Sequence, residues 1–324
     1  MHTSTSFKRL LLRNPGSDSY FDNISRSQRN DATYLRDPWL LETQRALGGF
    51  TVRRGWVHVH LNGLYWGVYD LEEHPGRETI YHHLVATEPA VASLAPGAER
   101  ILFLHYDGTD PATSLAAADP AAQDSWEAVI AASSAARQSP TDTGLYQLVA
   151  NQLGIPDYIS YMLALAVTGK DDLGWNEFRG WRHPISQKWH LMARDGDAAY
   201  FMDGFVGGTI FLNNLDKVNH FTPLPPGEDP VEIIPDQHPH EHLKFHPQSR
   251  AAFDARLQAL LRASSANPNG PWPLTQEGLL ARFDAHAGEF RRTFECEKQL
   301  ELQRHGSKGT VEEDAKRETA EISA

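Results

Sequence analysis

Residues 56–73, WVHVHLNGLYWGVYDLEE, restrict the fold of this chain more than any other stretch does. Valine and leucine alternate with histidine over residues 57–61, which is typical of a strand with one apolar face. The dipeptide Asn62-Gly63 follows, and it suits a type I′ turn because both turn residues need a positive φ. A second arm then runs over residues 64 to about 71. The sequence therefore predicts an antiparallel β-hairpin.

Three segments around this hairpin also have clear local patterns. Residues 7–14, FKRLLLRN, form a short apolar run that the turn-like NPGSD ends, so a strand is expected there. Residues 34–49, YLRDPWLLETQRALGG, have a proline for the first turn and a glycine pair at the end, which predicts a helix. Residues 101–108, ILFLHYDG, predict one more strand.

Apolar residues at three- and four-residue spacing dominate the rest of the chain. They predict helices at residues 125–138, 144–154, 155–169, 249–263 and 275–300. An aromatic-rich hairpin with the arms FRGW and KWHLMA interrupts these helices, and residues 222–247 read as a loop.

The order of these segments predicts an α+β fold in two parts. We expect a small strand-rich part at about residues 1–110 and a larger helical part at about 111–305. Residues 306–324 are polar and charged, which favours a mobile tail.

The charge balance limits the partners of the chain. Its formal net charge is -12 and its pI is about 5.7, whereas affinity for a nucleic-acid backbone depends on clustered lysine and arginine. No apolar run approaches the ~20 residues that span a bilayer. We therefore expect neither a nucleic-acid polymer nor a membrane as partner.

Cysteine content and the N-terminal sequence bear on the compartment. The only cysteine, Cys296, cannot form an internal disulfide, and MHTSTSFKRLLLRN lacks the apolar core of a secretory signal. Both features favour the cytoplasm. A chain whose true N-terminus lies further upstream would have the same features and could act at the surface or after export.

Five carboxylates and one asparagine lie within the 33 residues from Thr168 to Tyr200. Phosphoryl transfer needs a carboxylate that orients the attacking hydroxyl, and an amide and a second carboxylate that hold Mg²⁺. Asp171 and Asn176 have the five-residue spacing of protein kinases, and Asp195 follows the second arm of the next hairpin. The alternative is ordinary turn chemistry at the end of a helix or hairpin.

Five motifs in order also resemble a known family. They are LLLRNPGSD, LRDPWLLETQRALG, VHVHLNGLYWGVYDLEE, DDLGWN and WHLMARDGDAAY. From about Phe7 to Glu297 the chain resembles the CotH (spore coat protein H) family of atypical, secretory-pathway-like protein kinases. The resemblance implies a bilobal kinase-like fold, Mg-ATP as the phosphoryl donor, and Ser/Thr side chains of a protein substrate as acceptors.

The resemblance also implies roles for residues in the acidic stretch. Asp171 takes the position of the catalytic base, with Asp172 as the alternative because the alignment can slip by one residue. Asn176 takes the position of the metal-binding amide, and Asp195, helped by Asp197, that of the metal-binding carboxylate.

Two glutamates and two basic residues are candidates for nucleotide binding. Glu72 and Glu73 end the hairpin arm that should lead toward the hinge, so they are expected to contact adenine or ribose, unless they are exposed strand-end charges. Arg13 or Lys8 is expected to bind the phosphates.

For Arg13 the alternative is an ion pair with Asp37 or Glu42.

Two departures from the family keep other interpretations open. The family has strands upstream of LRN, often with a basic residue for the phosphates, and Glu177 stands where a second asparagine or an aromatic residue is common. We favour an active Ser/Thr protein kinase. The alternatives are a catalytically weak or inactive kinase-fold module that binds nucleotide or protein, and a shortened form of a longer protein.

Overall fold

The computed structural model of this chain has an α+β fold with two small antiparallel sheets. It describes residues 7, 9–14, 18, 33–94, 101–106, 115–116, 120–168, 178–196, 238–266 and 276–294. The prediction of an α+β class is confirmed.

The first sheet has the strand order β1-β3-β2. Its strands are β1 (Leu10–Arg13), β2 (Arg54–Leu61) and β3 (Leu64–Glu73). The predicted hairpin is confirmed, since β2 and β3 pair antiparallel around a turn in which Asn62 has φ 53° and Gly63 has φ 80°. The strand predicted at residues 7–14 is β1, which pairs with the other side of β3.

The second sheet has the strand order β5-β4-β6-β7. Its strands are β4 (Leu102–Tyr106), β5 (Leu115–Ala116), β6 (Phe178–Arg182) and β7 (Trp189–Ala193). The predicted aromatic hairpin is confirmed as β6 and β7. The strand predicted near residues 101–108 is β4, and its main partner is β6, far along the chain.

Helix α2 (Arg36–Ala46) is the predicted helix near residues 34–49. It begins two residues before Pro38, whose missing N–H costs nothing in a first turn, and Gly48 with φ 92° follows its end. Trp39 and Leu40 are buried, and the helix packs against α7 and β7. This helix therefore packs on the second sheet through β7.

The main hydrophobic core is formed largely by three central helices. They are α5 (Pro120–Gln138), α6 (Thr143–Gln152) and α7 (Ile155–Val167). Every residue of α7 from Tyr158 to Val167 is buried, because that segment is almost continuously apolar. These helices match the predictions, and α7 packs against β7 in the same core.

Further helices complete the described chain. They are α3 (Arg77–Thr87), α4 (Pro89–Ala92), α9 (His240–Leu243), α10 (Pro247–Ala266) and α11 (Gln276–Phe294). The last two match the predictions at residues 249–263 and 275–300, and the others were not predicted. The prediction of an uninterrupted loop at 222–247 is wrong, because α9 lies within it. Helix α3 was missed because its apolar stripe is narrow: of its hydrophobic residues only Ile80 and Leu84 are buried.

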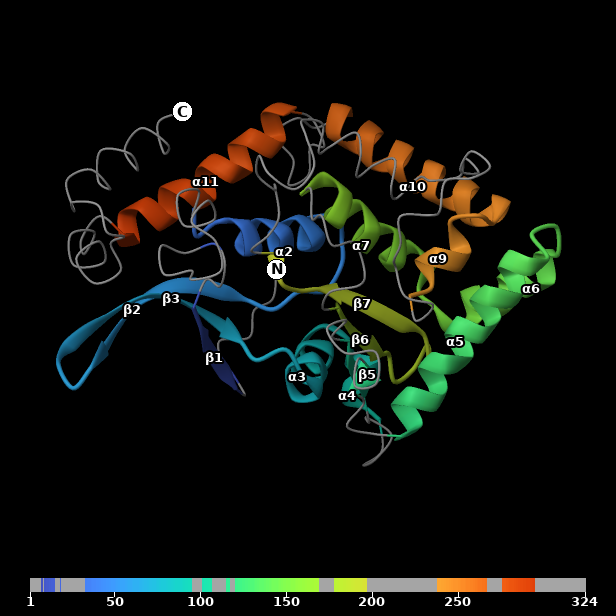
Figure 1. Cartoon of the computed structure of the whole chain (residues 1–324), viewed down its shortest axis with the longest axis horizontal. Helices are drawn as coiled ribbons and strands as arrows, with labels where there is room; N and C mark the ends of the chain where they lie inside the picture. The colour runs from blue at the N-terminus through green and yellow to red at the C-terminus, as the bar shows by residue number, and fades with distance from the viewer. Residues whose placement is uncertain are drawn as a thin grey trace, which may run out of the picture.

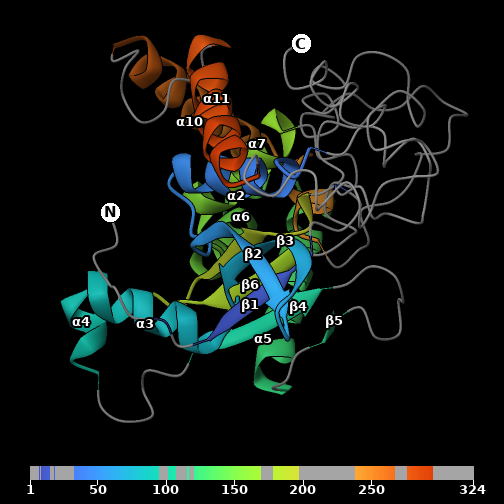
Figure 2. The ribbon, with the colours of Figure 1, turned by 90° about the vertical axis from the view of Figure 1, so that its left-hand side faces the viewer.

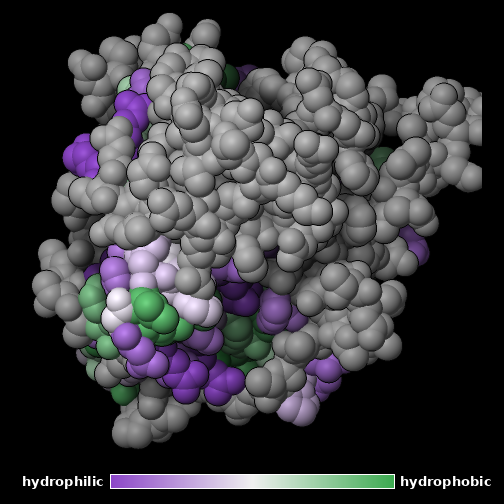
Figure 3. Space-filling model, turned by 60° about the vertical axis from the view of Figure 1, so that its left-hand side comes forward, coloured by the Kyte–Doolittle hydropathy of each residue, from purple (hydrophilic) through white to green (hydrophobic). Residues whose placement is uncertain are grey.

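Figure 1 shows α10 and α11 along one side of the molecule, with α2 and α7 between them and the strands. Figure 2, turned by 90°, again places α2 above the strands and α10 and α11 above α2. On the side of the β2–β3 hairpin, the described surface mixes apolar and hydrophilic patches (Figure 3). Within the described residues, no helix combines the length and apolar character that a membrane crossing requires.

Candidate functional site

Four carboxylates and three arginines gather where β1, α2, β2 and β3 approach the segment that follows β7. They are Asp37, Asp70, Glu72 and Asp195, together with Arg13, Arg54 and Arg194. Asp37, Asp70 and Glu72 each place one carboxylate oxygen within 4.8 Å of the others. Because they come from two elements that the fold brings together, this cluster is a product of the tertiary structure.

Arg13 joins the two ends of the cluster. Its Nη1 atom lies 3.1 Å from Oδ2 of Asp37 on α2, and its Nη2 atom donates to Oδ1 of Asp195 at 2.6 Å. The ion pair with Asp37 that the sequence offered as an alternative is confirmed. The planar guanidinium reaches both carboxylates at once because its donors point in different directions.

Alternation along β3 explains why its two acids share the site. Asp70 and Glu72 are two positions apart, so both side chains leave the same face of the strand. Arg54 on the neighbouring strand β2 pairs with Asp70, and its Nε atom donates to Oδ1 at 3.1 Å. Glu73 points away and pairs with Arg53 at 2.7 Å.

The end of β7 and the described residues after it, 194–196, are attached to the N-terminal part of the chain. The amide of Ala193 donates to Oε1 of Gln44 at 2.8 Å, and Gln44 Nε2 donates to the carbonyl of Leu191 at 2.7 Å. Arg194 Nη1 donates to Oε1 of Glu72 at 2.8 Å. Helix α2 and strand β3 therefore fix where β7 ends.

The next two residues are fixed in the same way. Asp195 has φ 56°, a left-handed conformation that is uncommon for a residue other than glycine. The amide of Gly196 donates to Oδ1 of Asp37 at 2.7 Å. A Cβ atom at Gly196 would lie 2.9 Å from Asp37 Cα and 2.9 Å from Leu40 Cβ, so only glycine fits this close to α2.

The electrostatic environment lowers one pKa in the cluster. Burial alone would raise the pKa of Asp37, but the guanidiniums of Arg13 and Arg54 and the amide of Gly196 lower it to about 2. Asp37 is therefore a permanent anion that can hold a cationic side chain in a fixed orientation.

Asp70 behaves in the opposite way. Burial raises its pKa to about 6, and the neighbouring charges of Asp37 and Glu72 add to this rise against the opposing effect of Arg54. The cluster holds four carboxylates and three guanidiniums, so its cations do not offset the effect of burial on Asp70.

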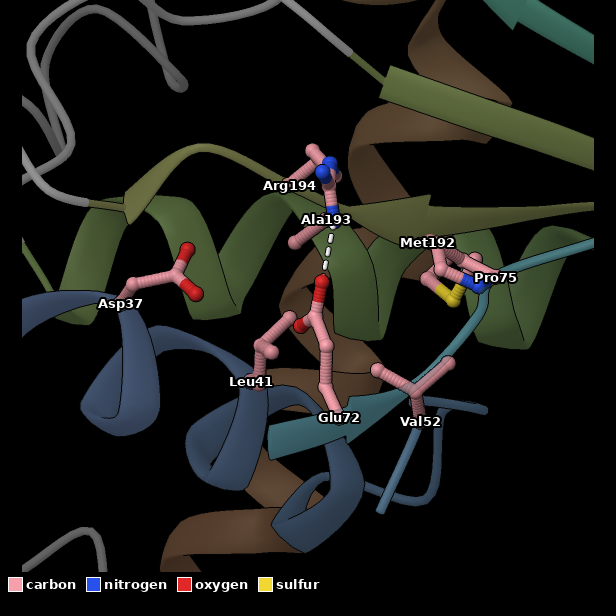
Figure 4. Close-up of a pocket in the computed structure, with 8 residues that line it drawn as sticks. All are labelled: Asp37, Leu41, Val52, Glu72, Pro75, Met192, Ala193 and Arg194. Atoms are coloured by element: carbon pink, nitrogen blue, oxygen red, sulfur yellow. Dashed lines mark hydrogen bonds and ion pairs between the residues drawn. The ribbon is translucent and has the colours of Figure 1, made fainter. Parts of the chain in front are cut away.

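A hollow opens beside these groups, and Figure 4 shows its walls. It is lined by Asp37, Leu41, Val52, Glu72, Pro75, Met192, Ala193 and Arg194. The side chain of Glu72 extends from β3 with one oxygen toward Arg194 and the other on the side of Asp37 (Figure 4). That second oxygen, Oε2, is buried and has no hydrogen-bond partner among the described residues.

The structure brings three of the predicted site residues together: Arg13, Glu72 and Asp195. Glu73 is not among them, because its carboxylate is bound by Arg53 and His83 on the other side of the sheet. The alternative of exposed strand-end charge is wrong for both glutamates, since each is buried. Five candidates lie outside the described residues: Lys8, Asp171, Asp172, Asn176 and Asp197.

Sequence reasoning missed three residues of the cluster, Arg54, Asp70 and Arg194, and noted Asp37 only as an ion-pair partner. It also missed Gln44, which holds the end of β7. A signal existed for Asp70, because a strand predicted from its alternation must place Asp70 and Glu72 on one face. No local signal marks Arg54 or Gln44, whose partners depend on the tertiary arrangement.

Comparison with known proteins identifies the family. Residues 22–231 match the family model described as CotH kinase protein. The chain belongs to the CotH kinase family. A search of curated proteins gives no match.

Membership in the CotH kinase family indicates a phosphotransferase-like enzyme, which in general terms uses ATP and a divalent metal. The matched range includes α2, β2, β3 and the segment after β7, and therefore six of the seven charged residues of the cluster. Arg13 precedes this range, although its guanidinium lies between two residues within it. Helices α9 to α11 follow it.

Proposed function

We propose that the chain is a bilobal protein kinase that transfers the γ-phosphate of Mg-ATP to Ser/Thr hydroxyl groups of a protein. The observation that carries this proposal is the position of Arg13 between Asp37 and Asp195. In protein kinases a basic residue on a strand pairs with an acid on the following helix, and the metal-binding aspartate comes much later in the chain. The same order is found here, with Arg13 on β1, Asp37 on α2 and Asp195 after β7.

In this proposal the kinase domain spans residues 1–305. The first sheet and α2 belong to the small lobe, and the core around α7 belongs to the large lobe. The predicted boundary near residue 110 would place β4 in the small lobe, but β4 pairs with β6. We therefore assign β4 to the large lobe.

Arg13 would bind the phosphates of the nucleotide. Its guanidinium is a planar donor group that matches phosphate oxygens, and Asp37 orients it through a partner that stays ionised. The fixed orientation matters because phosphoryl transfer depends mainly on positioning and charge stabilisation. Lys8 is the second candidate for this role.

Asp195 suits a divalent metal better than the other acids of the cluster do. Its side chain is 28% exposed, whereas those of Asp37, Asp70 and Glu72 are 8%, 5% and 0% exposed. Carboxylate oxygens are the ligands that Mg²⁺ prefers, and Asn176 and Asp197 would supply further oxygens. When bound, Mg²⁺ neutralises charge that develops on the phosphate oxygens.

The remaining chemistry concerns the acceptor. Asp171 would accept a hydrogen bond from the acceptor hydroxyl and so aim the hydroxyl oxygen at the γ-phosphate. Asp172 would take this role if the alignment with the family is shifted by one residue. Glu72 pairs with Arg194, so we assign it to the support of the segment after β7 in preference to a nucleotide contact.

The test combines nucleotide binding with phosphate transfer. Wild-type protein with Mg²⁺ and γ-labelled ATP should label itself or a serine-rich test protein, and Mg-ATP should raise its melting temperature. Asp195→Asn should lose both effects. Asp171→Asn should keep the thermal shift and lose the label. Asp254→Asn, an exposed acid on α10, is the matched control and should keep both.

We also consider a second function, because Asp195 already has a cationic partner in Arg13. If that pair persists with nucleotide bound, the chain would be a kinase-fold module that binds without efficient transfer. A thermal shift with no labelled product would support this alternative. A wild-type protein with neither a shift nor a label would reject both functions.

A further inference from the structure

The ion pair between Arg194 and Glu72 lies next to the proposed metal-binding residue. Arg194 immediately precedes Asp195, and its Nη1 atom donates to Oε1 of Glu72 at 2.8 Å. Both side chains are largely buried, at 15% and 0% exposure. The pair therefore connects the end of β3 directly to the backbone that carries Asp195.

Stability alone explains this pair poorly. Two buried charges lose their hydration, and a hydrophobic pair of similar volume is often at least as stable. Glu72 loses more than usual, because its Oε2 atom has no hydrogen-bond partner in the described part of the chain. A pair selected for stability would satisfy both oxygens.

The backbone at Asp195 needs support of this kind. A non-glycine residue with φ 56° persists only where its surroundings hold it, since other conformations are favoured by sterics. Gly196 is already held by Asp37 on the C-terminal side of Asp195. Arg194 is the corresponding attachment on the N-terminal side, so the two contacts together fix the direction of the Asp195 side chain.

We infer that Arg194 and Glu72 are positioning residues that aim the Asp195 carboxylate at the metal ion. This inference rests on the proposed function and adds to it two residues that touch neither nucleotide nor metal. Without the pair, Asp195 relaxes toward a conformation with negative φ and its carboxylate turns away from the site. The protein then needs more Mg²⁺ to hold the same nucleotide.

The experiment replaces the ion pair by an apolar pair that keeps the fold. The double variant Glu72→Met/Arg194→Met should melt close to the wild type, because it removes both charges of the ion pair together. The readout is the Mg²⁺ concentration at which ATP produces half of its maximal shift in melting temperature. We expect this concentration to rise by about tenfold or more, as is usual when a residue that orients a metal ligand is lost.

Two further variants separate positioning from stability. Arg194→Lys keeps a single charged donor and should stay near the wild-type Mg²⁺ requirement. Arg53→Met removes one of the two partners of Glu73, the next residue on β3, and should lower the melting temperature without changing the Mg²⁺ requirement. An unchanged requirement in the double variant, or an equal rise in Arg53→Met, would overturn the inference.

The failure of the proposed function gives a different result. In that case the wild type itself shows no Mg²⁺-dependent shift with ATP, and the inference falls with it. If the wild type shifts and the double variant shifts at the same Mg²⁺ concentration, the function stands and the positioning role is rejected.

Discussion

The Nη2 atom of Arg13 donates to Oδ1 of Asp195 at 2.6 Å, across 182 positions of the sequence. The same guanidinium contacts Asp37 on α2. In the proposed kinase, Asp195 is the carboxylate that meets the metal and Arg13 is the group that meets the phosphates. Each therefore has the other as its partner until nucleotide and metal arrive, and the pair must separate on binding.

Arg13→Gln is expected to change metal and nucleotide binding in opposite directions. The loss of a charge-assisted donor should weaken ATP binding by at least about 1.4 kcal/mol, or tenfold in affinity. Mn²⁺ alone, a spectroscopic substitute for Mg²⁺, should bind more tightly because Arg13 no longer competes for Asp195. Titration calorimetry with ATP and spin resonance with Mn²⁺ measure the two affinities.

Arg13→Lys is the matched control for this change, since it keeps the positive charge. It should retain most of the ATP affinity and leave the Mn²⁺ affinity near the wild-type value. If both affinities fall together in Arg13→Gln, competition between Arg13 and the metal is not the explanation.

Asp37 should make folding sensitive to acid. Its pKa is about 2 in the folded protein and 3.8 as the ordinary value, so the folded state binds its proton less readily than the unfolded state does. The stabilisation is fully present above about pH 4 and is lost as the pH falls toward about pH 2. It amounts to about 2 kcal/mol from the difference in pKa.

Urea unfolding at a series of acidic pH values measures this contribution. The difference in unfolding free energy between wild type and Asp37→Asn should shrink as the pH falls through this window. A difference that does not depend on pH would show that Arg13 and Arg54 do not stabilise the ionised carboxylate.

Asp70 should have the opposite dependence. Its folded pKa of about 6 exceeds the ordinary value of 3.8, so its contribution is most favourable below about pH 4 and is lost as the pH rises through about pH 6. The loss is about 3 kcal/mol. Asp70→Asn keeps a hydrogen-bonding side chain for Arg54 and removes the titration.

The variant should therefore gain stability relative to the wild type between about pH 4 and about pH 7. The same urea titrations give the answer. Parallel stability curves for the two proteins over this range would show that Asp70 ionises at its ordinary pKa.

Local patterns were sufficient for much of the fold. The β2–β3 hairpin was predictable because alternation and the Asn62-Gly63 turn act within a few residues, and α2 because its proline and glycines mark both ends. Pairing of β4 with β6 was not predictable, since it joins segments more than 70 residues apart whose register depends on the whole core.

In the candidate site too, residues marked by a sequence motif were predicted, and residues whose roles depend on the tertiary structure were not. Arg13 and Asp195 were predicted because motif order placed them, and they meet in the structure. Arg194 and Gln44 were missed because their roles come from partners on distant elements. Glu73 was wrongly grouped with Glu72, although neighbouring residues on a strand point to opposite faces and only one of them could face the cluster.

Gly196 provides the last prediction, which concerns the close contact between α2 and the segment that carries Asp195. A Cβ atom at this position would lie 2.9 Å from Cα of Asp37 and 2.9 Å from Cβ of Leu40, and a backbone atom cannot move aside cheaply. Gly196→Ala should therefore lower the free energy of unfolding by about 1–3 kcal/mol. It should also displace Asp195 and raise the Mg²⁺ requirement for the ATP-induced thermal shift. Gly55→Ala is the control, because a Cβ atom on that β2 residue would meet nothing within 4 Å. Equal stability and an equal Mg²⁺ requirement in the two variants would show that the contact between α2 and Gly196 is not rigid enough to position Asp195.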